Sequence, residues 1–151
     1  MNDTPSNLRC RCEYTYAFLL LRLFLGLRTF LAGLEKWESR GTYSFENYYN
    51  NMGRMAEGIT GASFLPLWMT KSYAHSLGYI LLVLGVLLLL GVKPRLTLFV
   101  SGLVYVGLSF GMMAVQEGEG IAWLAIHVIM FVGALLLVRH NRYSVWPDKF
   151  E

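Results

Sequence analysis

The chain has 151 residues, of which 55% are hydrophobic and 15% charged, and a formal net charge of +3. This length suits a single domain, and so apolar a composition argues against a soluble globular protein and favours a bilayer. The basic residues are divided among short segments. They therefore predict no nucleic-acid-binding patch.

Four apolar runs define the expected topology. They cover residues 14–34, 73–92, 96–116 and 121–138, and each approaches the ~20 residues that a helix needs to cross a hydrocarbon core of ~30 Å. The sequence thus predicts an all-α integral membrane four-helix bundle over residues 14–138, with an arm at 1–13 and a tail at 139–151. The first run contains Arg22 and no small-residue cleavage site follows it, so we expect it to remain in the mature protein rather than to be a signal peptide.

Lys and Arg residues in the arm, the tail and the link at 93–95 predict the orientation. Four spans place these three segments on one side, and the positive-inside rule makes that side cytoplasmic. We therefore expect a multi-pass protein of the inner (plasma) membrane, surrounded by lipid, with both termini in the cytoplasm. Cys10 and Cys12 lie in the arm and are expected to be reduced thiols, because two thiolates do not complete a zinc or iron–sulfur site.

The connection between the first two runs, residues 35–72, is long, whereas Gly91–Arg95 and Glu117–Gly120 are tight links that make the last three spans antiparallel neighbours. Ser44 is a suitable N-cap, and Gly58 or Gly61 a suitable stop, for an amphipathic helix in the outer interface. Such a helix could be a lid over the bundle, a docking surface or a substrate gate. Its apolar residues at helical spacing are Phe45, Tyr48, Tyr49, Met52, Met55, Ala56 and Ile59.

Ionisable side chains inside the apolar runs are the candidate site, because they are costly in a bilayer. Arg22 is about 12 Å from the near end of its span, too deep to reach the interface easily. The four runs contain no Asp or Glu, so Arg22 must be satisfied by carbonyls, Tyr105, an anionic or quinone-like headgroup, or a partner chain. Small residues on its face allow a neighbouring helix to approach closely. Arg28 lies nearer the outer end and is expected to be structural, reaching the interface or Glu35.

His75 and His127 enter their spans from the same side and are expected in one outer-leaflet layer, where they could face each other. Gly78 and Gly85 share the face of His75 and leave room for a flat ligand. The histidines could bridge helices by hydrogen bonds, contact quinone or lipid, or ligate a b-type haem, although no spacing motif supports haem. The candidate cofactor-binding residues are Arg22, His75, Tyr105 and His127; no residue is assigned as catalytic and no metal site is firm.

Three segments carry a family resemblance: Leu21–Gly26 with Phe30–Trp37, the second run with its exit through Gly91–Leu96, and Leu65-Pro66 between them. Over residues 14–138 the chain resembles the DoxX/DoxD-like membrane proteins, which are named after the membrane subunit of a thiosulfate:quinone oxidoreductase. The resemblance implies a four-helix bundle and a link to quinone or sulfur redox chemistry. Many members carry a glutamate near the start of the second helix, about where this chain has His75. If that glutamate is the usual counter-charge of the helix-one arginine, it is replaced here.

We therefore expect a membrane subunit of a respiratory or photosynthetic electron-transfer complex, non-catalytic on its own, or, if catalytic, part of a quinone-linked oxidoreductase. Its helix faces and the loop at 35–72 would contact a larger membrane complex. One alternative is a structural accessory subunit that stabilises such a complex. A second is a small-solute carrier, which the lack of an inverted repeat or of a pair of broken helices disfavours.

Overall fold

All four expected spans are helices in the computed structural model, which describes residues 5–146 of the chain and the side chains of residues 12–146. Each of the four is long and apolar enough to cross a membrane. The spans are α1 (Pro5–Glu35), α3 (Leu67–Leu90), α4 (Pro94–Ala114) and α5 (Gly118–Leu137), and a short 3-10 turn, η1 (Val138–His140), follows α5. The prediction of an all-α membrane bundle is confirmed.

Several helices begin before the predicted runs, and the difference is largest for α1 and α3. The arm is already helical from Pro5 onward and continues directly into the first span, because proline is well suited to the first position of a helix. Cys12 is a free, exposed thiol in this extension, and the side chain of Cys10 lies outside the described residues. Helix α3 begins at Leu67, immediately after Pro66. Pro66 has the extended backbone conformation that is typical of the residue before a helix.

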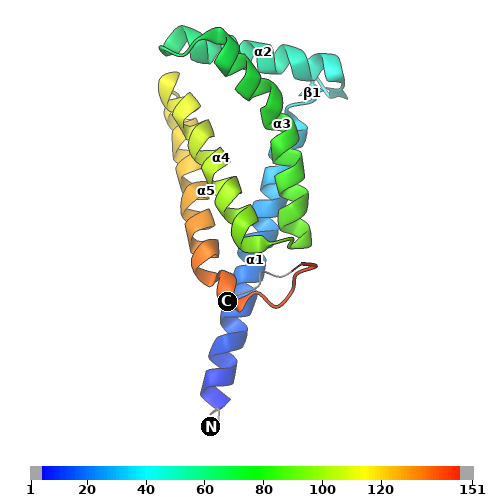
Figure 1. Cartoon of the computed structure of the whole chain (residues 1–151), viewed down its shortest axis with the longest axis vertical. Helices are drawn as coiled ribbons and strands as arrows, with labels where there is room; N and C mark the ends of the chain where they lie inside the picture. Colours follow the sequence, from blue (N-terminus) through cyan, green and yellow to red (C-terminus); the bar gives the residue numbers. More distant parts are fainter. Residues whose placement is uncertain (1–4, 147–151) are drawn as a thin grey trace.

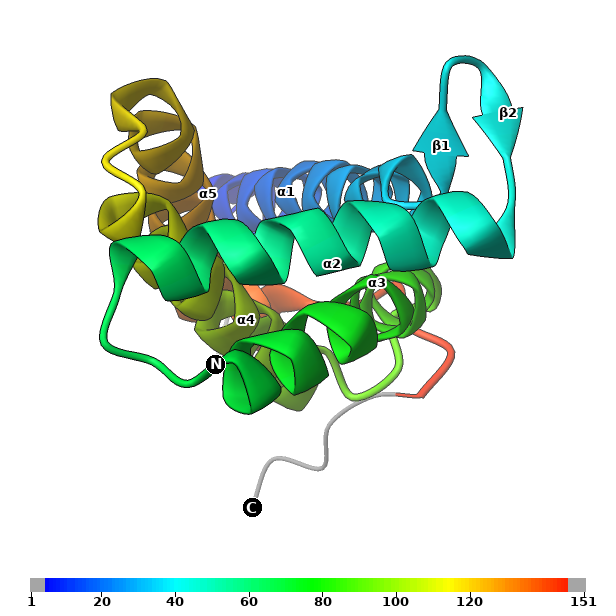
Figure 2. The ribbon, with the colours of Figure 1, turned by 90° about the horizontal axis from the view of Figure 1, so that it is seen from above.

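The amphipathic helix is present as α2 (Phe45–Ala62). Ser44 caps it as predicted, and the Ser44 hydroxyl accepts a hydrogen bond from the Asn47 N–H at 3.1 Å. Its buried side chains are Tyr48, Met52, Ala56 and Ile59. Figures 1 and 2 show α2 lying across one end of the bundle, opposite the end where α1 begins. These two ends are called the α2 end and the terminal end below.

A two-stranded hairpin joins α1 to α2 and was not predicted. Strands β1 (Glu38–Ser39) and β2 (Thr42–Tyr43) pair antiparallel. Arg40 and Gly41 between them both have positive φ, as a type I′ turn requires. The hairpin directs the chain from the end of α1 into the start of α2.

Replacing Ser44 by alanine is expected to destabilise the first turn of α2 by about 1 kcal/mol, because the N–H of Asn47 loses its acceptor. Amide hydrogen exchange of residues 46–49 in detergent or nanodiscs measures the effect. Ser44→Asp, which restores an acceptor, is the control and should keep the protection. Unchanged exchange in Ser44→Ala would contradict a capping role.

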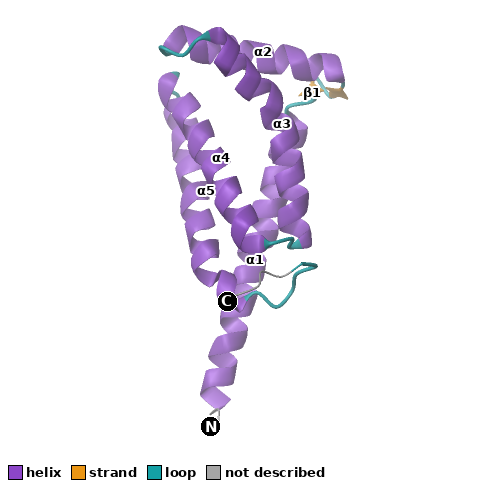
Figure 3. Cartoon of the chain, in the orientation of Figure 1, coloured by secondary structure: helices purple, strands orange, loops and turns teal. Residues whose placement is uncertain are grey.

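The four spans form two helix pairs. Glycines let α1 and α3 approach closely: a Cβ on Gly33 would be 2.9 Å from the backbone nitrogen of Leu82, and one on Gly26 would be 3.0 Å from Leu89. The second pair consists of α4 and α5. In Figure 1 the two pairs lie close together at the terminal end and diverge towards α2, while Figure 3 shows that loops occupy only the two ends. Buried apolar side chains fill the converging part, among them Phe18, Leu88, Leu98, Phe131 and Val138.

Candidate functional site

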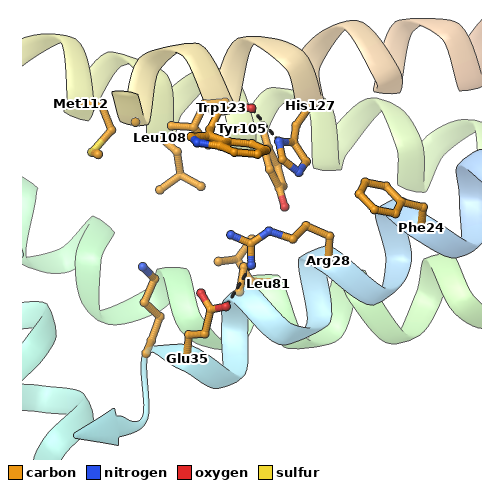
Figure 4. Close-up of a pocket in the computed structure, with 13 residues that line it drawn as sticks. Phe24, Arg28, Glu35, Leu81, Tyr105, Leu108, Met112, Trp123 and His127 are labelled. Atoms are coloured by element: carbon orange, nitrogen blue, oxygen red, sulfur yellow. Dashed lines mark hydrogen bonds and ion pairs between the residues drawn. The ribbon is translucent and has the colours of Figure 1, made fainter. Parts of the chain in front are cut away.

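A cavity of about 550 Å³ lies where the two helix pairs diverge. One wall comes from α1 and the other from α4 and α5, and Figure 4 shows their side chains facing each other across the space. Pockets of 300–1,000 Å³ are typical for small-molecule ligands. The lining residues are Phe24, Arg28, Ala32, Glu35 and Lys36 of the α1 wall, Leu81 of α3, Tyr105, Leu108 and Met112 of α4, and Gly120, Trp123, Leu124 and His127 of the α5 wall.

His127 is a buried polar group of this cavity. Its side chain is only 6% exposed, and its Nδ1 lies 2.6 Å from the backbone carbonyl oxygen of Trp123, one helical turn earlier. Its Nε2 is buried and has no hydrogen-bond partner among the described residues. A buried polar atom without a partner costs about 1–3 kcal/mol. This nitrogen is therefore the one lining atom that gains most from a polar ligand.

Tyr105 lies beside His127 and connects the two walls. The two rings stack with centroids 5.5 Å apart, and Phe24 of α1 stacks on the other side of the imidazole at 6.3 Å. The Tyr105 hydroxyl is 3.3 Å from the Thr29 hydroxyl on α1. Because Tyr105 is buried and bonded to the opposite wall, it fixes the deep part of the cavity and gives it an aromatic surface.

The α1 wall carries charge towards the α2 end. Arg28 and Glu35 form an ion pair with a distance of 3.0 Å between Nη1 and Oε1, one of the two arrangements that the sequence predicted for Arg28. Such a half-exposed pair adds little stability. Lys36 follows directly, and burial lowers the pKa of its ammonium group, an effect that the Glu35 carboxylate opposes. Arg28 and Lys36 both line the cavity, which the sequence analysis did not predict.

The structure brings together only two of the four predicted site residues, Tyr105 and His127. Arg22 is buried at the terminal end, where its Nη1 donates hydrogen bonds to the Asn141 side-chain oxygen at 3.2 Å and to the carbonyl oxygen of Tyr143. Carbonyls were among the partners that the sequence predicted for this arginine. Arg22 does not line the cavity.

His75 packs against α2 rather than lining the cavity. Its ring contacts the ring of Tyr49 at 5.3 Å, and its backbone carbonyl accepts a hydrogen bond from the hydroxyl of Tyr48. A Cβ on Gly78 would meet the ring of Tyr48, so the space left by this glycine is used by α2 rather than by a ligand. His75 does not line the cavity of His127, and the cavity therefore offers no second imidazole for a bis-histidine haem among its lining residues.

A second, smaller cavity of about 280 Å³ lies under α2, between α3 and α4. Apolar side chains such as Ile59, Met69 and Phe110 dominate its lining. Its one buried, unpartnered polar atom within the described residues is the hydroxyl of Tyr73. It therefore offers a polar ligand fewer contacts than the cavity of His127.

Among the described residues no group of three or more His, Cys, Asp or Glu side chains could hold a metal ion.

Comparison with known proteins supports the resemblance noted from the sequence. No curated protein and no solved structure matches the chain. The DoxX family model matches residues 17–110, which include the part of α1 that carries Arg22, all of α2 and α3, and most of α4. Because this match spans more than half of the chain, the protein belongs to the DoxX family and is a multi-pass membrane protein.

Proposed function

We propose that the protein binds a quinone-type ring ligand in the cavity between the α1 wall and the α4/α5 wall, as a membrane subunit of a redox complex. The observation that carries this proposal is the buried, unpartnered Nε2 of His127 at the edge of an aromatic cavity. A hydrogen-bonding group on the ring of the ligand would satisfy this nitrogen, because an imidazole nitrogen forms hydrogen bonds with polar groups of matching type.

The rest of the cavity suits a flat, weakly polar molecule. Phe24, Tyr105 and Trp123 offer aromatic surface for a ring, and such rings associate by stacked or edge-on contacts. Arg28 and Lys36 lie on the α1 wall and carry hydrogen-bond donors for an oxygen at the far side of the ring. Several lining residues are half-exposed on the apolar faces of the helices, among them Phe24 and Trp123, which supports entry of the ligand from the lipid phase.

The cellular setting belongs to the same proposal. Both termini would lie in the cytoplasm and the spans in the inner membrane, because the basic arm, link and tail lie on one side. The partner that exchanges electrons with the ligand would be another chain of the complex.

A structural accessory subunit is the second candidate function, and the surface at the α2 end favours it. Large apolar side chains are exposed there on the hairpin, on α2, on the connection to α3 and at the start of α3; they include Tyr43, Phe45, Phe64 and Trp68. Exposed aromatic clusters mark contacts with other chains or with the membrane interface. In this alternative the surface would bind a larger complex, and the cavity would hold a lipid.

Ligand binding can be tested with a short-chain quinone and, separately, with its quinol kept reduced under anaerobic conditions, each added to the protein in nanodiscs, by following the change in tryptophan fluorescence, since Trp123 lines the cavity. We expect saturable binding, and we expect the tighter-binding of the two forms to bind about tenfold more weakly to His127→Phe, because the variant keeps the stacked ring and loses one buried hydrogen bond. His75→Phe is the matched control, a histidine of the same bundle outside the cavity, and should bind like the wild type. An absence of saturable binding, or an equal loss in both variants, would overturn the proposal.

A further inference from the structure

The hydrogen bond at Nδ1 of His127 determines which kind of ligand atom its other nitrogen can bind. The Trp123 oxygen that lies 2.6 Å from Nδ1 belongs to a backbone carbonyl, and a carbonyl oxygen only accepts hydrogen bonds. The proton of the neutral imidazole is therefore on Nδ1. In that tautomer Nε2 has a lone pair and no hydrogen, so Nε2 is an acceptor that requires a donor from its partner.

We infer that the cavity selects the hydroxyl-bearing, reduced form of its ring ligand, a quinol, over the corresponding quinone. This inference rests on the proposed function and specifies the chemical state of the ligand. A quinol hydroxyl donates a hydrogen bond to Nε2. A quinone of the same skeleton presents only carbonyl oxygens, whose lone pairs would face the lone pair of Nε2, and the buried nitrogen would stay unsatisfied.

The described groups around the imidazole do not supply the missing donor. The Tyr105 hydroxyl is paired with Thr29 on the other wall, and Nη1 of Arg28 is paired with Glu35. Phe24, Leu81 and Leu124 have apolar side chains, and Nε2 has no partner among the described residues. The site is therefore one donor short, which a ligand hydroxyl would provide.

The charged side chains of the α1 wall do not distinguish the quinone from the quinol. Arg28 and Lys36 carry only donors, and the oxygen of a quinol and the oxygen of a quinone both accept hydrogen bonds. Glu35 is already paired with Arg28. His127 is therefore the residue that distinguishes a ligand with a hydrogen-bond donor from one without. A site built around one buried polar group rejects analogues that leave this group without a partner.

The test compares three ligands of one skeleton in the same buffer: a short-chain quinone, its quinol kept reduced under anaerobic conditions, and the dimethyl ether of the quinol. The ether has the quinol ring and no hydroxyl donor. With the wild-type protein in nanodiscs we expect the quinol to bind about tenfold more tightly than the quinone, and the ether to bind no better than the quinone. In His127→Phe the preference should disappear, and in His127→Gln, whose amide both donates and accepts, it should fall to a small difference.

The outcomes separate this inference from the proposed function. Saturable binding of the quinone with equal or higher affinity than the quinol would overturn the selectivity and leave the quinone-type site intact. A quinol preference that persists in both His127 variants would also overturn it, because the selecting group would lie elsewhere. If none of the three ligands binds saturably to the wild type, the proposed function itself fails.

Discussion

Replacing Arg22 by methionine is expected to release the segment 141–146 from the bundle. The Arg22 guanidinium donates to the Asn141 side chain and the Tyr143 carbonyl, and the same segment continues along the link after α3 through hydrogen bonds from Val145 N to Leu90 O and from Lys93 N to Trp146 O. A hydrogen bond to a charged group contributes about 1.5–3 kcal/mol. The amides of Val145 and Trp146 should therefore exchange about 10- to 100-fold faster with solvent in the variant.

The four spans of Arg22→Met, in contrast to the tail, should not lose thermal stability. Arg22 is only 4% exposed, its Nε has no hydrogen-bond partner among the described residues, and its side chain forms no ion pair with a described carboxylate. Replacing a buried, incompletely paired charge by an apolar side chain of similar length is often neutral or stabilising. We expect the bundle of Arg22→Met to unfold at the same temperature as the wild type or higher, while its tail is released.

A matched variant strengthens the same contact. In Asn141→Asp a carboxylate replaces the amide that accepts from Arg22. A hydrogen bond with one charged partner then becomes an ion pair with two, so the exchange at Val145 and Trp146 should slow. Ligand binding should be unaffected by Arg22→Met, because Arg22 does not line the cavity. Slow exchange of the tail in Arg22→Met would show that other contacts hold this segment.

The partners of Arg22 show which features of a buried charged residue can be predicted from a sequence and which cannot. Hydropathy placed Arg22 deep in the first span, and the lack of acidic residues in the spans left carbonyls, Tyr105, a headgroup or a partner chain as its partners, of which the structure has a carbonyl. The identity of the partner could not be predicted, because Tyr143 lies 121 residues further along the chain and the tail has no periodic pattern. Long-range polar contacts of irregular segments leave no local signal in a sequence.

The two histidines illustrate the limit of helical periodicity. Depth along a helix follows from residue counting, and it placed His75 and His127 on the same side of the membrane. Whether they meet depends on how the helices diverge and on what α2 covers. Tyr48 and Tyr49 of α2 lie against the first turns of α3 and surround His75, whereas His127 lies where α4 and α5 separate from α1. These are tertiary properties that one amphipathic pattern does not encode.

The fold is more predictable because its determinants are local. Four apolar runs, Ser44 as an N-cap, and Gly91 before Pro94 define most helix ends. Gly91 has a φ of +71° and ends α3, and a side chain there would also collide with the guanidinium of Arg22. One glycine thus serves both the helix end and the contact that holds the tail.

Replacing Gly85 by alanine is expected to disrupt the packing of α1 against α3. A Cβ at Gly85 would lie 2.6 Å from both the Cα and the backbone nitrogen of Phe30. Backbone atoms cannot rotate away as a side chain can, so the two helices would have to separate. Overpacking of this kind costs ~1–3 kcal/mol, and we expect the upper end of that range, even though alanine favours a helix by up to ~1 kcal/mol over glycine. The measurement is the unfolding free energy in mixed micelles.

Gly102→Ala is the matched control, because it has the opposite expected sign. A Cβ at Gly102 on α4 would lie 3.7 Å from Phe131, an ordinary van der Waals distance, so only the helix preference of alanine remains and the protein should be unchanged or slightly more stable. Since Gly85 also sets the distance between the α1 wall and α3, Gly85→Ala should weaken quinone binding together with stability, whereas Gly102→Ala should affect neither. Equal stability of the two variants would show that α1 and α3 are not held at the close distance on which the shape of the cavity depends.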